Sequence, residues 1–355
     1  MNWNNELTNL LSIKYPIVQA PMLGVTTPAM VAAVANRGGL GSLPVGGLSP
    51  QQTSDLIRQT KGLTSKPFAV NLFAHDIPSI DVAEAEAMQV YLSDFCYTHQ
   101  LPYEPVDLKT LRFYAYQEQI EVLIREQIPV VSFTFGIIDD ESMARLKAAG
   151  SRLIANATSV AEAQFMSEKN IDAITIQGIE AGGHRGSFLA TDSLPMVGLM
   201  ALLPQVASQV RKPLLAAGGI YNGTTIKAAM MLGASGVQIG TAFIASPESK
   251  AIAAYKDRIL RATETDTRLT RSFSGRWARG IINTFMESVD RSGLAIPAYP
   301  IQNSITTQLR AVAQSQNNAE FTNMWAGQSA STTKAKPTGE IFDELIAETE
   351  RLQMD

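Results

Sequence analysis

Eight short apolar runs set the strongest constraint on the fold. They cover residues 16–22, 40–45, 68–73, 130–136, 152–157, 173–178, 214–219 and 236–241. Their apolar residues are continuous rather than alternating, as in strands that are buried on both faces of a parallel sheet. Helical segments separate most of the runs. Residues 27–39, for example, begin with Thr-Pro and end with Gly-Gly, which are helix start and stop signals.

Eight strands that alternate with helices predict a (β/α)8 TIM barrel. A Rossmann-like open sheet is the alternative, but it would require a G-x-G-x-x-G turn after an early strand, and none is present. Two stretches interrupt the alternation. Residues 74–128 are too long for one crossover, and residues 247–325 follow the eighth run and look mostly helical. We therefore expect a barrel of residues 1–245 and 326–355, with a smaller helical substrate-site domain, residues 246–325, inserted after strand 8.

The composition argues against several classes of function. The 355-residue chain has a formal net charge of −4, and no cluster of Lys and Arg offers a surface for nucleic acid. Its single cysteine, Cys96, excludes an intrachain disulfide framework, and its three histidines are too scattered for a recognisable metal site. No run approaches the roughly 18 apolar residues that cross a bilayer, and the N-terminus lacks a signal-peptide pattern. We expect a cytoplasmic protein without a membrane or nucleic-acid partner.

The active site of a TIM barrel lies at the carboxyl ends of its strands. Here these ends carry glycines and uncharged amides with almost no carboxylates. Such a lining does not suit a hard divalent cation, which requires several oxygen anions, nor the carboxylate pair of a glycosidase. It suits a flat heteroaromatic cofactor that is bound through backbone groups and neutral amides.

The last two runs predict a phosphate site. The loops after strands 7 and 8 bind phosphate in many barrels. Gly218 and Gly219 allow backbone N–H groups to approach an anion closely, and Thr241 adds a hydroxyl next to a helix start. The alternative is that these glycines only permit tight turns. Because both loops carry the pattern, we expect a cofactor that bears a phosphate.

The segment IQGIEAGGHRG, residues 176–186, follows the sixth run and contains His184. Histidine is the side chain best suited to proton transfer near neutral pH, and this loop projects from the face where cofactor and substrate must meet. His184 is therefore the candidate catalytic residue. His75 follows another strand in a short loop, and His99 falls near a helix end, so both are expected to be structural or exposed. Glu180 and Arg185 of the same segment receive no role.

Four blocks of the sequence resemble the motifs of the nitronate monooxygenases, formerly called 2-nitropropane dioxygenases. The blocks are residues 19–43, 68–73, 176–186 and 214–243, and they fall in the order of that family. The C-terminal segments AIPAYPIQNSITTQLR and MWAGQ resemble its bacterial, class I-like branch. The resemblance implies an FMN-dependent enzyme that oxidises alkyl nitronates, with propionate 3-nitronate as the physiological toxin to be removed.

The resemblance also implies roles for individual residues. His184 matches the active-site histidine, which acts as a base on neutral nitroalkanes or as a partner of the nitronate anion. Pro21 and Met22 would lie against the flavin ring. The residues that would hold FMN are Asn71, Gln177, Gly182, Gly183, Gly218, Gly219, Gln238, Ile239, Gly240 and Thr241. Those that would line the substrate pocket are Tyr255, Tyr299 and Tyr114, with Tyr116 as an alternative to Tyr114. Asn303 departs from the family pattern, which would place an aromatic or basic residue there.

In the implied reaction, the nitronate anion lies against the flavin, and O2 is consumed to give a carbonyl compound and nitrite. The protein supplies orientation and electrostatics, while the cofactor supplies the redox chemistry. A related FMN barrel that reduces enoyl thioesters or quinones with NAD(P)H is the alternative enzyme. A barrel isomerase, an aldolase or a module that binds a phosphorylated ligand is the non-redox alternative, although no lysine lies in the eight runs. The oligomeric state, monomer or homodimer, and the preferred nitronate do not follow from the sequence.

Overall fold

The computed structural model describes residues 3–189 and 193–352. Eight parallel strands form one sheet in the order β1-β9-β8-β6-β5-β4-β3-β2. A parallel bridge between Val18 and Leu40 joins the two ends of this order and closes the sheet into a barrel. The strands are β1 (Ile17–Gln19), β2 (Ser42–Pro44), β3 (Ala69–Phe73), β4 (Val130–Thr134), β5 (Arg152–Ala157), β6 (Ala173–Gln177), β8 (Leu214–Ala217) and β9 (Gly236–Ile239). The predicted TIM barrel is confirmed, and each strand lies within its predicted run.

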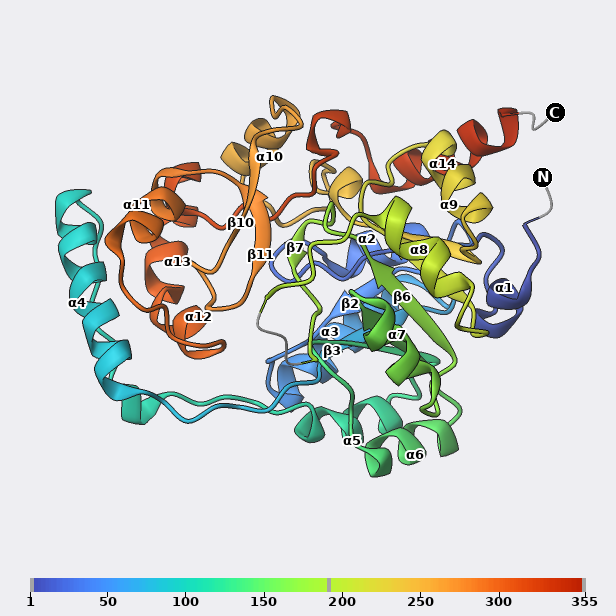
Figure 1. Cartoon of the computed structure of the whole chain (residues 1–355), viewed down its shortest axis with the longest axis horizontal. Coiled ribbons are helices and arrows are strands. Elements are labelled where there is room, and N and C mark those ends of the chain that lie inside the picture. Colours follow the sequence, from blue (N-terminus) through green and yellow to red (C-terminus); the bar gives the residue numbers. More distant parts are fainter. Residues whose placement is uncertain (1–2, 190–192, 353–355) are drawn as a thin grey trace.

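Helices surround the barrel, as Figure 1 shows. They are α2 (Pro28–Ala35), α3 (Pro50–Leu63), α5 (Gln117–Arg125), α6 (Asp140–Ala148), α7 (Val160–Ser167), α8 (Leu199–Ala207), α9 (Gly223–Met231) and α14 (Thr338–Arg351). Side-chain caps start several of them: Thr27 accepts from the N–H of Met30, and Asp139 accepts from the N–H of Ser142. These caps satisfy N–H groups that have no partner inside the helix. They explain why the helices begin where the sequence signals predicted.

The amino end of the barrel is closed by apolar packing. One residue from most strands, among them Val130, Ile154 and Leu215, joins a buried cluster with Leu7 and Leu11 of α1 (Glu6–Leu11). Because α1 fills this end, a ligand can enter the barrel only from the carboxyl ends of the strands. None of the described helices is long and apolar enough to cross a membrane.

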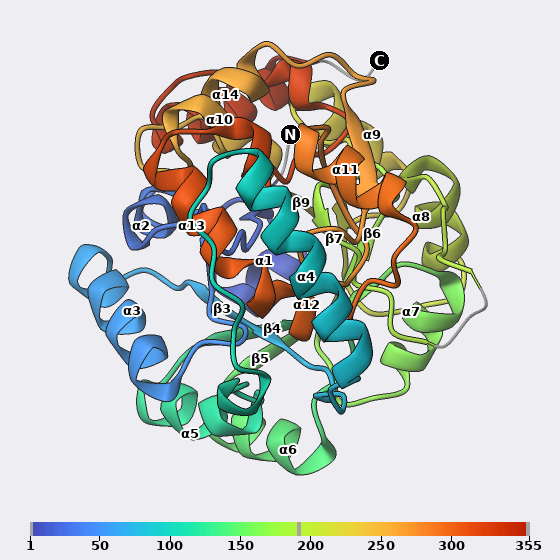
Figure 2. The same cartoon turned by 90° about the vertical axis from the view of Figure 1, so that its left-hand side faces the viewer.

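A second apolar core lies beside the barrel. It contains Phe285 of α11 (Thr284–Ser292), Ile305 of α12 (Ile301–Ile305) and Leu309 of α13 (Thr307–Ser315). Leu92 of α4 (Val82–Thr98) belongs to the same core, and Figure 2 shows α4 lying across these helices. Residues 74–128 therefore contribute to both parts of the molecule. α4 packs in the second core, and α5 packs on α3 and α6 of the barrel.

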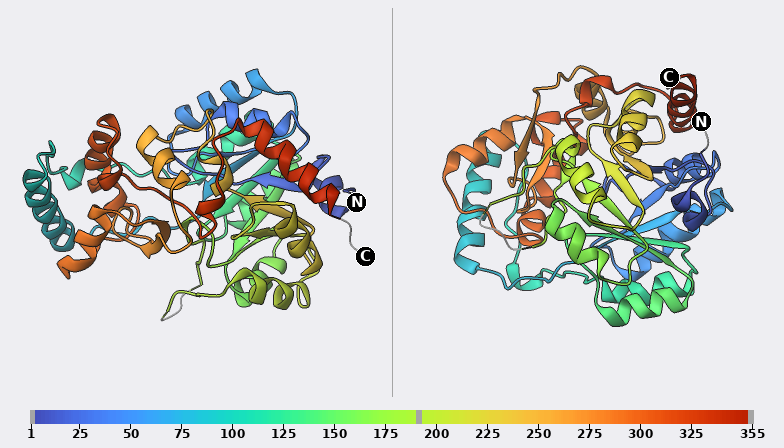
Figure 3. Two further views of the ribbon diagram at one scale, coloured as in Figure 1. Left: turned by 90° about the horizontal axis from the view of Figure 1, so that it is seen from above. Right: turned by 45° about the vertical axis from the view of Figure 1, so that its right-hand side comes forward.

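Residues 246–325 also contain strands that the sequence did not predict. β10 (Thr267–Thr270) and β11 (Ala278–Ile281) pair antiparallel, and β11 pairs with β7 (Gly183–His184), which lies in the loop after β6. We call α4 and residues 246–325 the second unit. In the views of Figure 3 this second unit lies at one end of the barrel, away from the two termini. The domain boundary at residues 245/246 stays a prediction. The β7–β11 pairing nevertheless links the second unit to the loop that carries His184.

Candidate active site

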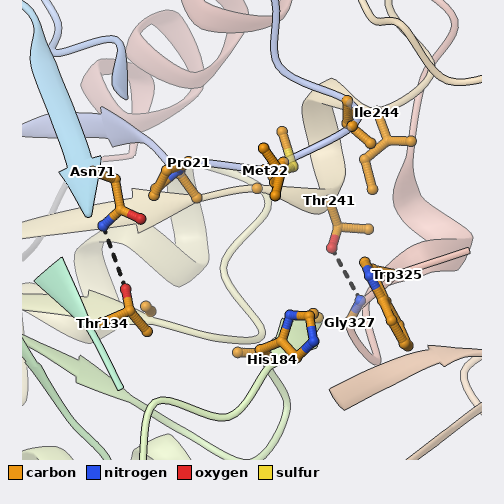
Figure 4. A pocket seen from close by; sticks show the side chains of 18 of the residues that line it. Pro21, Met22, Asn71, Thr134, His184, Thr241, Ile244, Trp325 and Gly327 are labelled. Atoms are coloured by element: carbon orange, nitrogen blue, oxygen red, sulfur yellow. Dashed lines mark hydrogen bonds between the residues drawn. The ribbon is translucent and has the colours of Figure 1, made fainter. Parts of the chain in front are cut away.

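A cavity of about 410 Å³ lies between the carboxyl ends of the strands and the second unit. All of the predicted site residues line it except Ile239, Tyr114 and the alternative Tyr116, whose hydroxyl donates to Asp139. Ile239 packs in the core between the sheet and the helices, and the Tyr114 ring packs under the guanidinium of Arg112. In Figure 4, Pro21 and Met22 lie on one side of the cavity and His184 lies on the opposite side.

The loops after β8 and β9 contain the residues predicted to bind phosphate. Gly218 and Gly219 have φ angles of +111° and +68°, a region that residues with a Cβ rarely adopt. Next to them α9 begins at Gly223, and its N-cap Asn222 accepts a hydrogen bond from Thr225. The Thr241 hydroxyl accepts a hydrogen bond from the N–H of Gly327 at 3.0 Å, which Figure 4 shows as a dashed line. This hydroxyl is therefore held in place at the end of β9.

Asn71 of β3 is held by two hydroxyls of the neighbouring strand β4. Its Nδ2 donates to Ser132 at 3.0 Å and to Thr134 at 3.3 Å. Both Nδ2 hydrogens are thus used, and Oδ1 is the end of the amide that remains for a ligand. Nearby, the buried Nδ2 of Asn156 has no hydrogen-bond partner among the described residues, although Asn156 lines the same cavity. A buried N–H donor without a partner destabilises the fold unless a ligand accepts its hydrogen bond.

Three contacts hold His184. Its backbone pairs with Ala278 of β11, its carbonyl accepts from Nε2 of Gln177 at 3.0 Å, and its ring Nε2 lies 2.8 Å from Oγ of Ser274. Gln177 also accepts from the N–H of Gly186 at 2.9 Å. Gln177 therefore holds the backbone of the histidine loop, in addition to the cofactor role that the family resemblance implies.

The contacts of Ser274 favour one tautomer of His184. The serine hydroxyl donates to the carbonyl of Arg276 at 3.2 Å. Since a hydroxyl has one hydrogen, Oγ then accepts from Nε2–H of His184. This assignment leaves Nδ1 unprotonated and without a partner among the described residues, so that Nδ1 is the ring nitrogen available to a substrate.

Two properties of the surroundings keep His184 neutral. The pKa of His184 is lowered to about 3. Burial is the larger cause, and the positive charges of Arg276 and Arg310 add to it. A neutral imidazole can accept a proton from a neutral nitroalkane. An anion bound beside it would raise its pKa again, because a nearby negative charge favours the protonated ring.

The two residues without a predicted role are structural. The carboxylate of Glu180 accepts from the N–H of Leu199 at 2.8 and 3.0 Å, and thereby caps α8, whose N-cap is a glycine without a side chain. The Arg185 side chain is 1% exposed and donates to the carbonyls of Gly178 at 2.6 Å and Gln177 at 3.2 Å. Both residues fix the loop that follows β6.

The predicted tyrosines differ in their surroundings. The hydroxyl of Tyr255 is buried and donates to the carbonyl of Trp325, so its contribution is to position Trp325 at the cavity wall. The ring of Tyr299 lies 6.0 Å from that of His184 and 5.0 Å from that of His75. Its hydroxyl donates to no described residue and remains available to a substrate. Burial is the main reason that the pKa of Tyr299 rises to about 12, so this hydroxyl stays protonated.

Several cavity residues were missed by sequence reasoning. Trp325 lies 5.3 Å from the His184 ring, centre to centre, and Figure 4 shows both side chains at the cavity. Arg310 of α13 also lines the cavity. The one available signal was its position seven residues after Asn303, two helical turns further on. Within residues 3–189 and 193–352, no group of three or more His, Cys, Asp or Glu side chains is placed to hold a metal ion.

The chain is similar to known proteins in both sequence and structure. The chain matches the family model described as nitronate monooxygenase over residues 4–348. A probable nitronate monooxygenase of Staphylococcus aureus (strain JH9) is 43% identical over 346 residues, which cover 97% of each chain. The solved structure of nitroalkane oxidase from Streptomyces ansochromogenes has a TM-score of 0.88 and 35% identity, and the match covers 98% of each chain. FabK from Thermotoga maritima has a TM-score of 0.75 and 27% identity, over 98% of this chain and 96% of FabK.

The closed barrel, its cavity at the carboxyl ends of the strands and these similarities define an oxidoreductase of the (β/α)8-barrel class. Within that class, the chain belongs to the nitronate monooxygenase family, because the family model and the relative each cover nearly its whole length. The predicted family is confirmed.

Proposed function

We propose that the protein is an FMN-dependent enzyme that oxidises alkyl nitronates with O2 to a carbonyl compound and nitrite. Propionate 3-nitronate is the proposed substrate, and its removal in the cytoplasm is the proposed role. The single observation that carries the proposal is the position of His184, neutral and anchored at both ring and backbone, at a cavity otherwise lined largely by uncharged groups.

The residues at the cavity fit FMN. The backbone of Gly218 and Gly219 and the hydroxyl of Thr241 would hold its phosphate, which needs N–H and O–H donors more than it needs a lysine. Oδ1 of Asn71 and the unpaired Nδ2 of Asn156 are an acceptor and a donor of the kind that a flavin ring requires. Pro21, Met22, Gly182, Gln238 and Gly240 complete the proposed binding surface. When bound, FMN supplies the electron transfer between nitronate and O2.

The substrate would lie between the flavin site and the second unit. His184 presents Nδ1, Tyr299 presents a protonated hydroxyl, and Trp325 forms an apolar wall beside both. A nitronate arrives already deprotonated, so no proton has to be removed from its carbon. It needs hydrogen-bond donors for its oxygens, which Tyr299 supplies directly and His184 supplies once the anion has raised its pKa. With a neutral nitroalkane, Nδ1 of His184 would instead take the proton from the carbon.

Reconstitution and assay test the proposal. The purified protein is expected to be yellow, or to become so on addition of FMN, and to consume O2 when a nitronate is added. A colourless protein that does not bind FMN would contradict it. Oxidation of NAD(P)H with an enoyl thioester or quinone, without nitronate-dependent O2 uptake, would favour the alternative reductase instead.

A further inference from the structure

Arg310 brings a positive charge to the cavity wall that no carboxylate of the described chain neutralises. It extends from α13 and lines the same cavity as His184 and Tyr299. Some arginines of the second unit form ion pairs, such as Arg258 with Glu320 and Arg291 with Glu287. Arg310 makes no ion pair with any residue in 3–189 or 193–352. Burial lowers its pKa to about 10, so that it still carries its charge at neutral pH.

Neutral acceptors hold the guanidinium in one orientation. Nε donates to the hydroxyl of Thr306 at 3.2 Å, and Nη2 donates to the carbonyl and the Oδ1 of Asn303 at 2.6 and 3.0 Å and to Thr307 at 3.1 Å. Nη1 donates to no described residue. One nitrogen of the planar group is therefore free, while the other two are fixed by groups that carry no charge.

A second cation lies near the same histidine, but its position leaves it less available. The guanidinium of Arg276 stacks on the ring of Phe135, with its central carbon 4.1 Å from the ring centre, and it donates to the backbone carbonyls of Arg185 and Ser187. Arg276 is not among the cavity-lining residues. Arg310 is thus the arginine that a ligand in the cavity can reach. Burying a cation away from water destabilises the protein unless an anion lies beside it. For Arg310, the cavity is the place from which such an anion can approach.

We propose that Arg310, oriented by Asn303, binds a carboxylate at the end of the substrate remote from the nitronate group. Arg310 then determines the preference for nitronates with a charged tail over those with an apolar tail. The guanidinium is suited to this role because its charge is fixed in position and its Nη1 still has N–H groups to donate to a carboxylate oxygen. The inference rests on the proposed function for the reaction at the other end of the substrate, near His184 and Tyr299.

A substrate comparison tests the inference on the FMN-loaded protein. The variants are Arg310→Gln, which removes the charge, and Arg310→Lys, which keeps the charge but not the planar guanidinium. Arg261→Gln is the control, because Arg261 is exposed and lies at the C-cap of α10 (Ala253–Leu260). The measured quantity is the ratio of kcat/KM for propionate 3-nitronate to that for propyl-1-nitronate. We expect Arg310→Gln to lower this ratio on the order of 30-fold or more. Arg310→Lys should lower it less, and Arg261→Gln should leave it unchanged.

An equal loss of kcat/KM for both nitronates in Arg310→Gln, or no loss for either, would overturn the inference. If Arg310→Gln does not fold, Asn303→Ala provides the second test, because it removes the Oδ1 contact that orients the guanidinium and keeps the charge. We expect Asn303→Ala to lower the same ratio several-fold, and an unchanged ratio would overturn the inference.

A binding measurement separates this inference from the proposed function. Succinate has the charge and the planar oxygen pair of propionate 3-nitronate at both ends, whereas butyrate lacks one of them. Calorimetric titration should show that succinate binds more tightly than butyrate to the wild-type protein, and that Arg310→Gln abolishes the difference. This result without any nitronate oxidation would refute the proposed function and keep the carboxylate site. If the protein oxidises nitronates but the wild type and Arg310→Gln bind succinate with the same affinity, the proposed function is kept and the carboxylate site is refuted.

Discussion

Nε2 of His184 lies 2.8 Å from Oγ of Ser274, so a serine of the second unit sets the orientation of the histidine that the barrel loop presents to the cavity. The same unit pairs β11 with the histidine backbone. The ring and the backbone of His184 are therefore each held by a residue about ninety positions further along the chain. Its orientation depends on the docking of the two units as much as on the barrel.

Replacing His184 with asparagine should separate cofactor binding from turnover. Asparagine cannot act as a base, and the groups proposed to hold FMN lie elsewhere in the cavity. We expect His184→Asn to retain FMN and to lose roughly 10²- to 10⁴-fold in kcat/KM with a neutral nitroalkane, the usual contribution of general base catalysis. The visible spectrum and the rate of O2 uptake measure the two properties. A full rate in the variant would refute the role given to His184.

Removing the hydroxyl of Ser274 should weaken catalysis without removing the base. In Ser274→Ala, Nε2 loses the partner that holds both its tautomer and its orientation. A misoriented base lowers the rate, and we expect a loss of roughly 10-fold in kcat/KM, in the range reported for partners that orient a functional histidine. The control is Ser208→Ala, which removes the Ser208 hydroxyl at the C-cap of α8. Equal rates for Ser274→Ala and the wild type would show that the hydrogen bond has no part in positioning.

The neutral state of His184 predicts how stability depends on pH. Its pKa is about 3 in the folded protein and near the ordinary 6.5 when unfolded, so between these values the unfolded state binds more protons. Stability therefore falls as the pH falls through this window, by about 2 kcal/mol between pH 6.5 and pH 5 from this group alone. His75, whose pKa burial also lowers, acts in the same direction.

Denaturant unfolding at pH 7 and pH 5 checks this expectation. His184→Gln cannot take up the proton, so it should lose less stability than the wild type over this interval. His99→Gln is the control, because His99 is exposed. If His184→Gln and the wild type lose the same free energy of unfolding, the histidine is not held neutral by its surroundings.

The capping role of Glu180 predicts a change in stability. Glu180→Ala leaves the N–H of Leu199 without its acceptor at the start of α8. We expect a loss of about 1 kcal/mol in the free energy of unfolding, typical of a removed cap. The control is Glu121→Ala, which breaks an exposed ion pair with Arg145 and should cost less than about 0.5 kcal/mol. Equal effects of the two substitutions would refute the assignment of Glu180 as a cap.

The barrel could be predicted because each of its strands is a local signal. Runs such as residues 214–217 are apolar without a break, since both faces of the sheet are covered. The position of His184 at the cavity followed from counting these runs. The β7–β11 pairing could not be predicted, because β7 has two residues and no periodicity, and its partner lies far along the chain.

The other features of the site that the sequence could not predict depend on the partners of individual side chains. Gln177, Glu180 and Arg185 occur in one short loop with His184, and the sequence cannot tell which of them face the cavity and which hold the loop together. The structure shows that Glu180 and Arg185 both hydrogen-bond to backbone groups, and that Glu180 also lines the cavity. Arg310 belongs to a helix whose pattern resembles an ordinary surface helix. Its position in the lining of the cavity distinguishes it from the other arginines of the described chain.

The most direct test of the account is O2 consumption by the FMN-loaded wild-type protein, measured with nitrite release across a panel of nitronates and neutral nitroalkanes. We predict rapid O2 uptake and nitrite formation with nitronates. Both rates should be higher with propionate 3-nitronate than with nitronates that have an apolar tail. A protein that binds FMN but consumes no O2 with any nitronate would contradict the central claim.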